Sequence, residues 1–265
     1  MEMIDTHAHL DGEEFNEDLS EVVERALKAG VNKVFLPAIN LSSVTTIETV
    51  CCRYPDFAYP MIGLHPEEVK EDWEEVLAVM RGKLLENLTN TTDRTFKYIA
   101  VGEVGLDFYW SKTYRQEQLS AFEEQVKWSV ETRLPLSIHC RKAQNEMVHI
   151  LKSYAKELPG GVFHCFTGNE KEAAELLNFE RFVLGIGGVL TFKKSHLPEV
   201  LPQIPIERIV LETDSPYMAP VPMRGKRNES AYVRYILQKM AECYDISEED
   251  VARITTANAL RIFNI

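Results

Sequence analysis

The sequence predicts an α/β fold, a TIM (β/α)8 barrel, and three observations lead to this fold class. Short apolar runs alternate with segments of helical periodicity about eight times, the count that closes such a barrel. The length of 265 residues suits one domain over residues 1–265, since these barrels commonly have about 250 residues. Polar side chains follow the apolar runs, as they do at the catalytic face of a barrel. An open doubly wound sheet is the alternative, but it would place a glycine-rich phosphate turn where this chain has a histidine pair.

In the first half of the chain, three apolar runs are each followed by a helical pattern. The runs read as strands because they are short and rich in β-branched or aromatic residues, and the segments behind them carry apolar side chains at helical spacing. The first helix ends at a glycine cap, Gly30. Residues 81–97 are polar and fit either an extension of the third helix or a surface loop. The strand and helix pairs lie at residues 1–4 and 13–30, 33–39 and 42–53, and 57–63 and 67–80.

The second half of the chain continues this alternation to its end. Three strands are again followed by helices, the seventh strand ends in two glycines, and two helices follow the last strand. The expected strands are residues 98–102, 134–138, 161–163, 182–186 and 208–211. The expected helices are residues 114–132, 143–157, 169–178, 229–244 and 247–263.

The amino-acid composition indicates where in the cell the protein is expected and how it can bind nucleic acid. Lys and Arg number 29 and Asp and Glu 41, so the net charge of −12 leaves no diffuse basic surface for nucleic acid. No basic leader with an apolar run and no membrane-spanning stretch is present, which predicts a cytoplasmic protein without membrane contact. The five cysteines show neither zinc-knuckle nor secreted-disulfide spacing, so we expect reduced thiols.

The histidine pair His7 and His9 lies at the end of the first strand, and two residues one position apart on a strand project from the same face. Other metal-ligand residues also follow expected strands. Of the seven histidines, only His149 and His196 lie elsewhere. Because the strands of a barrel end at one face, we expect these side chains to converge. They are His7, His9, His65, Glu103, His139, His164 and Asp214.

Four histidines and two carboxylates exceed the needs of one tetrahedral ion but suit two divalent ions that share a carboxylate. Glu103 is the expected bridge. The predicted ligands of the first ion are His7, His9 and Asp214, and those of the second are His139 and His164. The sequence does not choose between Mg, Mn and Zn. Non-catalytic ions that only stabilise a binding module are an alternative.

Two close ions bind a bridging water, lower its pKa toward about 7 and flank a tetrahedral centre under in-line attack. This predicts a hydrolase in which the bridging hydroxide attacks and Asp214 is the general base. Strand alternation turns Cys140 and Cys165 away from the barrel axis, toward the helices. Glu212 either orients a ligand histidine or closes the barrel floor, and Asp5 has the same two interpretations.

Several motifs resemble those of the TatD family of metal-dependent hydrolases. They are Asp5-Thr6-His7-Ala8-His9-Leu10-Asp11, Gly63-Leu64-His65-Pro66, Gly102-Glu103-Val104-Gly105-Leu106-Asp107-Phe108-Tyr109, His164-Cys165-Phe166-Thr167-Gly168 and Glu212-Thr213-Asp214-Ser215-Pro216. The resemblance implies a TIM barrel, a divalent-metal centre on the residues above and deoxyribonuclease activity, with 3′ exonuclease action or abasic-site cleavage. Lys142 and Ser230 depart from the family, which usually has Asp and Pro there; neither is a proposed ligand, and Lys142 could shift substrate preference.

Basic residues that follow the fifth, seventh and eighth strands predict a cationic rim around the metals. The substrate-binding candidates are His65, Arg141, Arg224 and Arg227. Aromatic residues at strand ends could stack on unpaired bases: Phe108, Tyr109, Trp110, Phe166 and Tyr217. We therefore expect DNA as the partner, with single-stranded or frayed 3′ ends, and no obligate protein partner. An ester, amide or lactone hydrolase with the same binuclear centre is the alternative, although a neutral substrate needs no cationic rim.

Overall fold

The computed structural model describes residues 1–90 and 96–265. Eight parallel strands follow one another in chain order around one sheet. Backbone hydrogen bonds join its two edges, from Thr6 N to Leu211 O at 3.0 Å and from Asp214 N to His7 O at 2.9 Å. The predicted TIM barrel is confirmed. The strands are β1 (Met3–Asp5), β2 (Val31–Pro37), β3 (Ala58–Ile62), β4 (Ala100–Asp107), β5 (Leu136–Arg141), β6 (Gly161–Phe163), β7 (Phe182–Ile186) and β8 (Ile209–Leu211).

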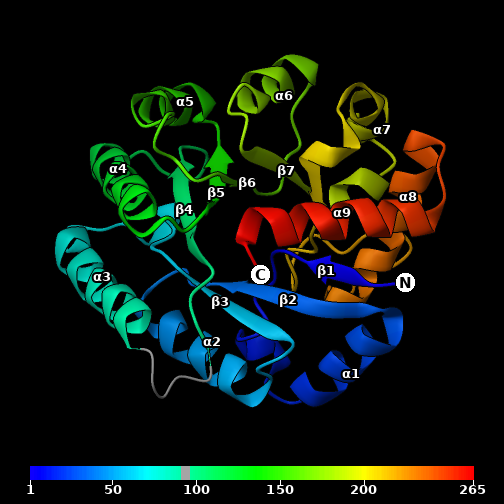
Figure 1. Cartoon of the computed structure of the whole chain (residues 1–265), viewed down its shortest axis with the longest axis horizontal. Helices are drawn as coiled ribbons and strands as arrows, with labels where there is room; N and C mark the ends of the chain where they lie inside the picture. Colours follow the sequence, from blue (N-terminus) through cyan, green and yellow to red (C-terminus); the bar gives the residue numbers. More distant parts are fainter. Residues whose placement is uncertain (91–95) are drawn as a thin grey trace.

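Helices surround these strands (Figure 1). Their bounds are α1 (Leu19–Ala29), α2 (Leu41–Arg53), α3 (Trp73–Thr89), α4 (Arg115–Thr132), α5 (Gln144–Ser153), α6 (Glu170–Leu177), α7 (Leu197–Val200), α8 (Val233–Tyr244) and α9 (Glu248–Phe263). The sequence predicts that residues 81–97 either extend the third helix or form a surface loop. They extend the helix as far as Thr89, where α3 ends. Residues 91–95 of that segment lie outside the described part. Among the described helices, none is long and apolar enough to cross a bilayer.

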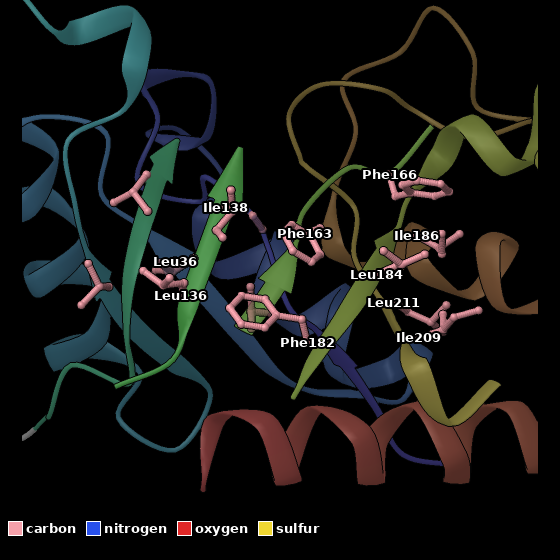
Figure 2. Packing of buried hydrophobic residues seen from close by; sticks show 14 of the residues in the cluster. Leu36, Leu136, Ile138, Phe163, Phe166, Phe182, Leu184, Ile186, Ile209 and Leu211 are labelled. Carbon is pink, nitrogen blue, oxygen red and sulfur yellow. The ribbon is translucent and has the colours of Figure 1, made fainter. Parts of the chain in front are cut away.

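The amino-terminal end of the barrel is closed by α9, the red helix in Figures 1 and 2. Phe263 of α9 packs against Phe35 of β2 with ring centroids 4.6 Å apart. These two join inward-facing residues of the other strands, among them Met61 and Val210, in one buried cluster. The barrel is therefore filled with apolar side chains at this end, which leaves the carboxyl ends of the strands for polar groups.

The outward faces of the strands pack on the surrounding helices. Phe163 of β6 stacks on Phe182 of β7 with ring centroids 5.0 Å apart, as the close view in Figure 2 shows. Alternation then places the residues between these apolar ones on the barrel axis. His164 and Glu212 follow the inward-facing Val162 and Val210 by two residues, so they also face the barrel axis. A layer of polar side chains therefore lies directly above the apolar side chains that fill the barrel.

Strands β4 and β5 run further than the sequence predicts. Every residue of β4 is buried as far as Asp107, so Glu103 lies within the strand and not after it. The pairing with β5 shifts between Val101 and Val104: these residues are three positions apart on β4, but their partners Leu136 and Ile138 are two positions apart on β5. Such a bulge re-aims a side chain, and here it lies at Glu103.

Candidate metal centre

The Glu103 carboxylate lies at the centre of a ring of histidines and is almost fully buried. Its Oε2 is 3.2 Å from His7 Nε2 and 3.7 Å from His9 Nε2. Its Oε1 faces three other imidazoles: His139 Nδ1 at 3.1 Å, His65 Nε2 at 3.4 Å and His164 Nε2 at 3.6 Å. One oxygen therefore points to each half of the site, which is the arrangement a bridging carboxylate needs.

The first half of the site is built where β1 and β8 meet. His9 Nε2 is 3.6 Å from Asp214 Oδ1, and His7 Nε2 is 4.0 Å from the same oxygen. Buried Asp5 holds the two strand ends together, because its carboxylate accepts hydrogen bonds from Thr213 N at 2.9 Å and Thr213 Oγ1 at 2.6 Å. Asp5 thus closes the barrel and contacts no ligand ring nitrogen, which favours the structural interpretation of this residue.

The second half contains His139 and His164, and each has a carboxylate behind it. Asp107 Oδ2 is 3.0 Å from His139 Nε2, and Glu212 Oε1 is 3.0 Å from His164 Nδ1. In both rings the other nitrogen faces Glu103, so a carboxylate fixes the orientation of each ring, as is typical of metal-ligating histidines. Gly185 makes room for Glu212, since a Cβ there would lie 2.1 Å from Glu212 Oε2.

His65 differs from the other four histidines in its hydrogen bonding. Its Nδ1 accepts a hydrogen bond from Glu67 N at 3.2 Å, so the neutral ring carries its proton on Nε2. That nitrogen faces Glu103 Oε1 and the open centre. A protonated Nε2 is a donor and not a metal ligand, which supports the substrate-binding role over a ligand role, although His65 lies within ligand distance of Glu103 and His139.

The donor set fits divalent ions. Among the described residues, Nδ1 of the fully buried His7 has no hydrogen-bond partner, and Nε2 has only the Glu103 carboxylate 3.2 Å away, without hydrogen-bond geometry. Burial and the nearby charge of His164 lower the His7 pKa, although Glu103 opposes this. His7 is therefore neutral, with a lone pair free. Burial opposes protonation of His164, but the Glu212 and Glu103 charges outweigh it and raise the pKa to about 10. The carboxylates of Glu103 and Glu212 therefore favour positive charge at this position. A bound cation would supply that charge in place of the proton on His164.

The position of Cys165 corrects the expectation that it faces the helices. Its Sγ lies within 4.8 Å of ligand atoms of His164 and Asp214. The reason is that β6 ends at Phe163, and Cys165 has a φ of +49°, so strand alternation no longer applies. Burial, with the nearby carboxylate charges, raises the pKa of the thiol well above its usual range, so Cys165 is a neutral wall of the site. Cys140 packs on the helix side as expected.

The three rim arginines lie in different surroundings. Arg141 is exposed and lies over the Tyr109 ring, with Cζ 3.8 Å from the centroid. Arg224 is also exposed and lies over Phe192 at 4.0 Å. Arg227 is bound to Asp18, with Nη2 2.7 Å from Oδ2, and it covers the Phe15 ring. The structure therefore leaves Arg141 and Arg224 accessible, whereas the Arg227 charge is matched by a carboxylate.

Asp107 contacts His139 and is a further candidate residue of the site, to which the sequence motifs give no role. It shares the inward face of β4 with Glu103, four residues earlier, and this spacing is the signal that could have identified it. Burial disfavours its ionisation, but hydrogen bonds from His139 and from Tyr109 N outweigh this and keep its pKa below the usual value.

We expect Asp107→Asn to weaken metal binding about 10- to 100-fold, the usual effect of losing such a partner. The amide oxygen can still accept from Tyr109 N, but its NH2 group then faces His139 Nε2 and forces the proton onto Nδ1, the nitrogen that faces Glu103. Titration calorimetry with Mn²⁺ would measure this loss. Unchanged affinity in a variant with unchanged thermal unfolding would contradict the role.

A TIM barrel whose carboxyl-terminal face gathers histidines around one shared carboxylate defines the class of metal-dependent hydrolases. Comparisons with known proteins agree. The family model of the TatD-related DNases matches residues 4–264, and the chain belongs to this family.

Relatives match over nearly the whole chain. The uncharacterised metal-dependent hydrolase YabD of Bacillus subtilis strain 168 is 38% identical over 264 residues, 99% of each protein. The 3′-5′ ssDNA/RNA exonuclease TatD of Citrobacter rodentium is 34% identical, over 99% of this chain and 98% of that protein. The crystal structure of YJJV, a TatD homologue from Escherichia coli, superposes with a TM-score of 0.90 at 26% identity, covering 99% and 98% of the two chains. The protein is therefore a metal-dependent hydrolytic enzyme of the TatD family.

Proposed function

We propose that this protein is a nuclease that releases nucleotides from the 3′ ends of single-stranded DNA. The observation that carries the proposal is the position of Glu103, whose two oxygens face two separate groups of ligands at an open barrel mouth. Two groups of ligands that share one carboxylate would hold two divalent ions, which would supply the charge stabilisation that phosphodiester hydrolysis needs. Related proteins over the full chain length are named 3′-5′ ssDNA/RNA exonucleases, which supports a nucleic acid as the substrate.

Each residue has a defined part in the proposed reaction. His7, His9 and Asp214 would hold one ion, His139 and His164 the other, and Glu103 both. Divalent ions there would lower the pKa of a water toward about 7 and polarise the phosphate. Burial opposes ionisation of Asp214, but His9 and the other imidazoles outweigh it and lower the pKa. Asp214 is thus ionised and, facing the open mouth, can accept the proton of the attacking water. His65 Nε2 and Arg141 would donate to the phosphate oxygens.

The observed geometry disfavours the two alternatives from the sequence. A purely structural ion is enclosed by its ligands, whereas His9 and Asp214 keep 15% and 17% of their side chains exposed at the mouth. Chelation should therefore abolish hydrolysis while the far-ultraviolet circular dichroism stays that of the folded barrel. Unfolding by the chelator would instead support structural ions. A neutral ester, amide or lactone offers nothing for the exposed guanidinium of Arg141 to bind.

The test is release of mononucleotides from 3′-labelled and 5′-labelled single-stranded DNA, with Mg, Mn and Zn supplied in turn. We expect immediate release of the 3′ label, late release of the 5′ label, and loss of both in Asp214→Asn. The same oligonucleotide as RNA and as a blunt duplex sets the substrate range. No release with any metal, from protein shown to hold metal, would contradict the nuclease and favour a carbonyl substrate.

A further inference from the structure

Among the described residues, three exposed aromatic side chains lie around the metal centre: Tyr217, whose ring centroid is 6.1 Å from that of His9, and the adjacent pair Tyr109 and Trp110. Tyr109 is 51% and Trp110 66% exposed, in the loop that follows β4. Phe108 and Phe166, which the sequence also suggested for stacking, are instead buried in the core. Two adjacent exposed aromatic rings form an apolar surface beside the polar groups of the site, and contiguous apolar surfaces rimmed by polar residues mark binding sites.

The pair is held in a fixed arrangement. The Tyr109 and Trp110 rings meet edge to face, with centroids 4.9 Å apart. The Arg141 guanidinium covers both, 3.8 Å from the Tyr109 centroid and 5.1 Å from the Trp110 centroid. Within residues 1–90 and 96–265, no carboxylate forms an ion pair with Arg141. Its charge therefore steadies the aromatic rings and is still available to a phosphate.

The same elements tie this aromatic pair to the metal ligands. The Asp107 carboxylate accepts hydrogen bonds from Tyr109 N at 2.8 Å and Trp110 N at 3.4 Å through Oδ1, and it contacts His139 through Oδ2. Arg141 follows His139 by two residues on β5, and its carbonyl accepts a hydrogen bond from Phe108 N at 2.9 Å. The backbone that carries the aromatic rings is thus linked through Asp107 to His139 of the candidate metal centre.

A hollow of about 170 Å³ opens beside Trp110. Asp107 and Pro66 form part of its wall, and Ser111, Tyr114 and Gln118 contribute polar groups. It is smaller than the cavities of about 300–1,000 Å³ that enclose drug-sized ligands. The hollow offers space for the edge of one flat ring beside the indole, and the Tyr114 hydroxyl, which donates to Glu71 Oε1, can still accept a hydrogen bond there.

We propose that Trp110, supported by the edge-to-face Tyr109 ring and by Arg141, stacks on one unpaired base of the nucleic acid whose phosphodiester lies at the metal centre. This site rests on the nuclease function proposed above and adds the side chains that contact a base next to the cleaved bond. A duplex covers both faces of every internal base, so a paired end must fray before any base but its last can use the site. Every base has a π face, so the site accepts all four with little sequence preference.

The test combines a protein change with a substrate change. The affinity of Mn²⁺-loaded enzyme for a fluorescent phosphorothioate oligo-dT, which resists hydrolysis, is measured by anisotropy for the wild type, Trp110→Ala and Trp110→Phe. A single abasic residue is placed at each of the first four positions from the 3′ end in turn. Val79→Ala, an exposed residue of α3, is the control that should leave binding unchanged.

We expect Trp110→Ala to weaken binding about 5- to 100-fold, the range for one stacked base, and Trp110→Phe to weaken it less. One abasic position should cause a similar loss, and the two losses should not add, because each removes one side of the same contact. Unchanged affinity in Trp110→Ala, or losses that add at every position, would overturn the stacking site.

A small phosphodiester without a base, methyl 4-nitrophenyl phosphate, separates this site from the function on which it rests. If the enzyme hydrolyses that compound but does not bind the oligonucleotide, the stacking site is overturned and the proposed phosphodiesterase activity stands. Trp110-dependent oligonucleotide binding without hydrolysis by any metal form overturns the nuclease and leaves the stacking site.

Discussion

Glu103→Ala is expected to remove both metal binding and hydrolysis. The Glu103 oxygens lie within 3.7 Å of the nearest nitrogens of all five histidines of the site. Removing this one anion leaves each half of the centre with imidazoles and no shared ligand. We expect metal affinity to fall by more than the roughly 10- to 100-fold loss for an outer partner. Hydrolysis should fall about 10³-fold or more, beyond the effect of losing one transition-state donor.

Metal content by mass spectrometry and release of the 3′ label measure the two effects on one sample. Glu103→Gln keeps the shape of the side chain and one acceptor, so it isolates the effect of the charge. Glu24→Ala on the exposed surface of α1 is the matched control and should behave as the wild type. If Glu103→Ala keeps full metal content and full hydrolysis, Glu103 is not a metal ligand.

Most of the barrel could be predicted because each strand is a short apolar run with a helical pattern behind it. The polar segment after residue 80 could not be assigned, although its buried residues Leu84 and Asn87 continue the helical spacing of Leu77 and Met80. Asn87 looks like a loop residue in the sequence. In the structure its side chain accepts a hydrogen bond from Tyr98 N at 3.1 Å, a contact that depends on the folded chain.

The metal site shows where strand alternation succeeds and where it fails. It correctly turns Glu212 toward the barrel axis, because β8 is regular up to that residue, and of the two interpretations left open the contact with His164 Nδ1 at 3.0 Å favours orientation of a histidine. It fails at Cys165, where the backbone leaves the extended conformation. Strand alternation also gives no role to Asp107. The sequence predicts that the fourth strand ends before Glu103, so a polar residue four positions later looks like part of a surface turn, whereas β4 in fact extends to Asp107.

The second large effect concerns Gly105, which lies opposite His139 in the β4–β5 pairing. Its φ is +146°, and a Cβ there would lie 1.8 Å from His139 O. The clash is with backbone, which cannot rotate away as a side chain could. Backbone strain and overpacking cost about 1–3 kcal/mol each, so Gly105→Ala should lower the free energy of unfolding by about 2–6 kcal/mol. This is a large part of a typical stability of about 5–15 kcal/mol.

Urea unfolding of chelator-treated protein measures this loss without the contribution of bound metal. Gly82→Ala is the matched control, because Gly82 lies within α3 with nothing within 4 Å of its Cβ position. That change should raise stability by about 0.5–1 kcal/mol through helix propensity. Equal effects of the two substitutions would contradict the close approach of β4 to β5. If Gly105→Ala stays folded, it should bind metal more weakly, because the added methyl group displaces the backbone that carries His139.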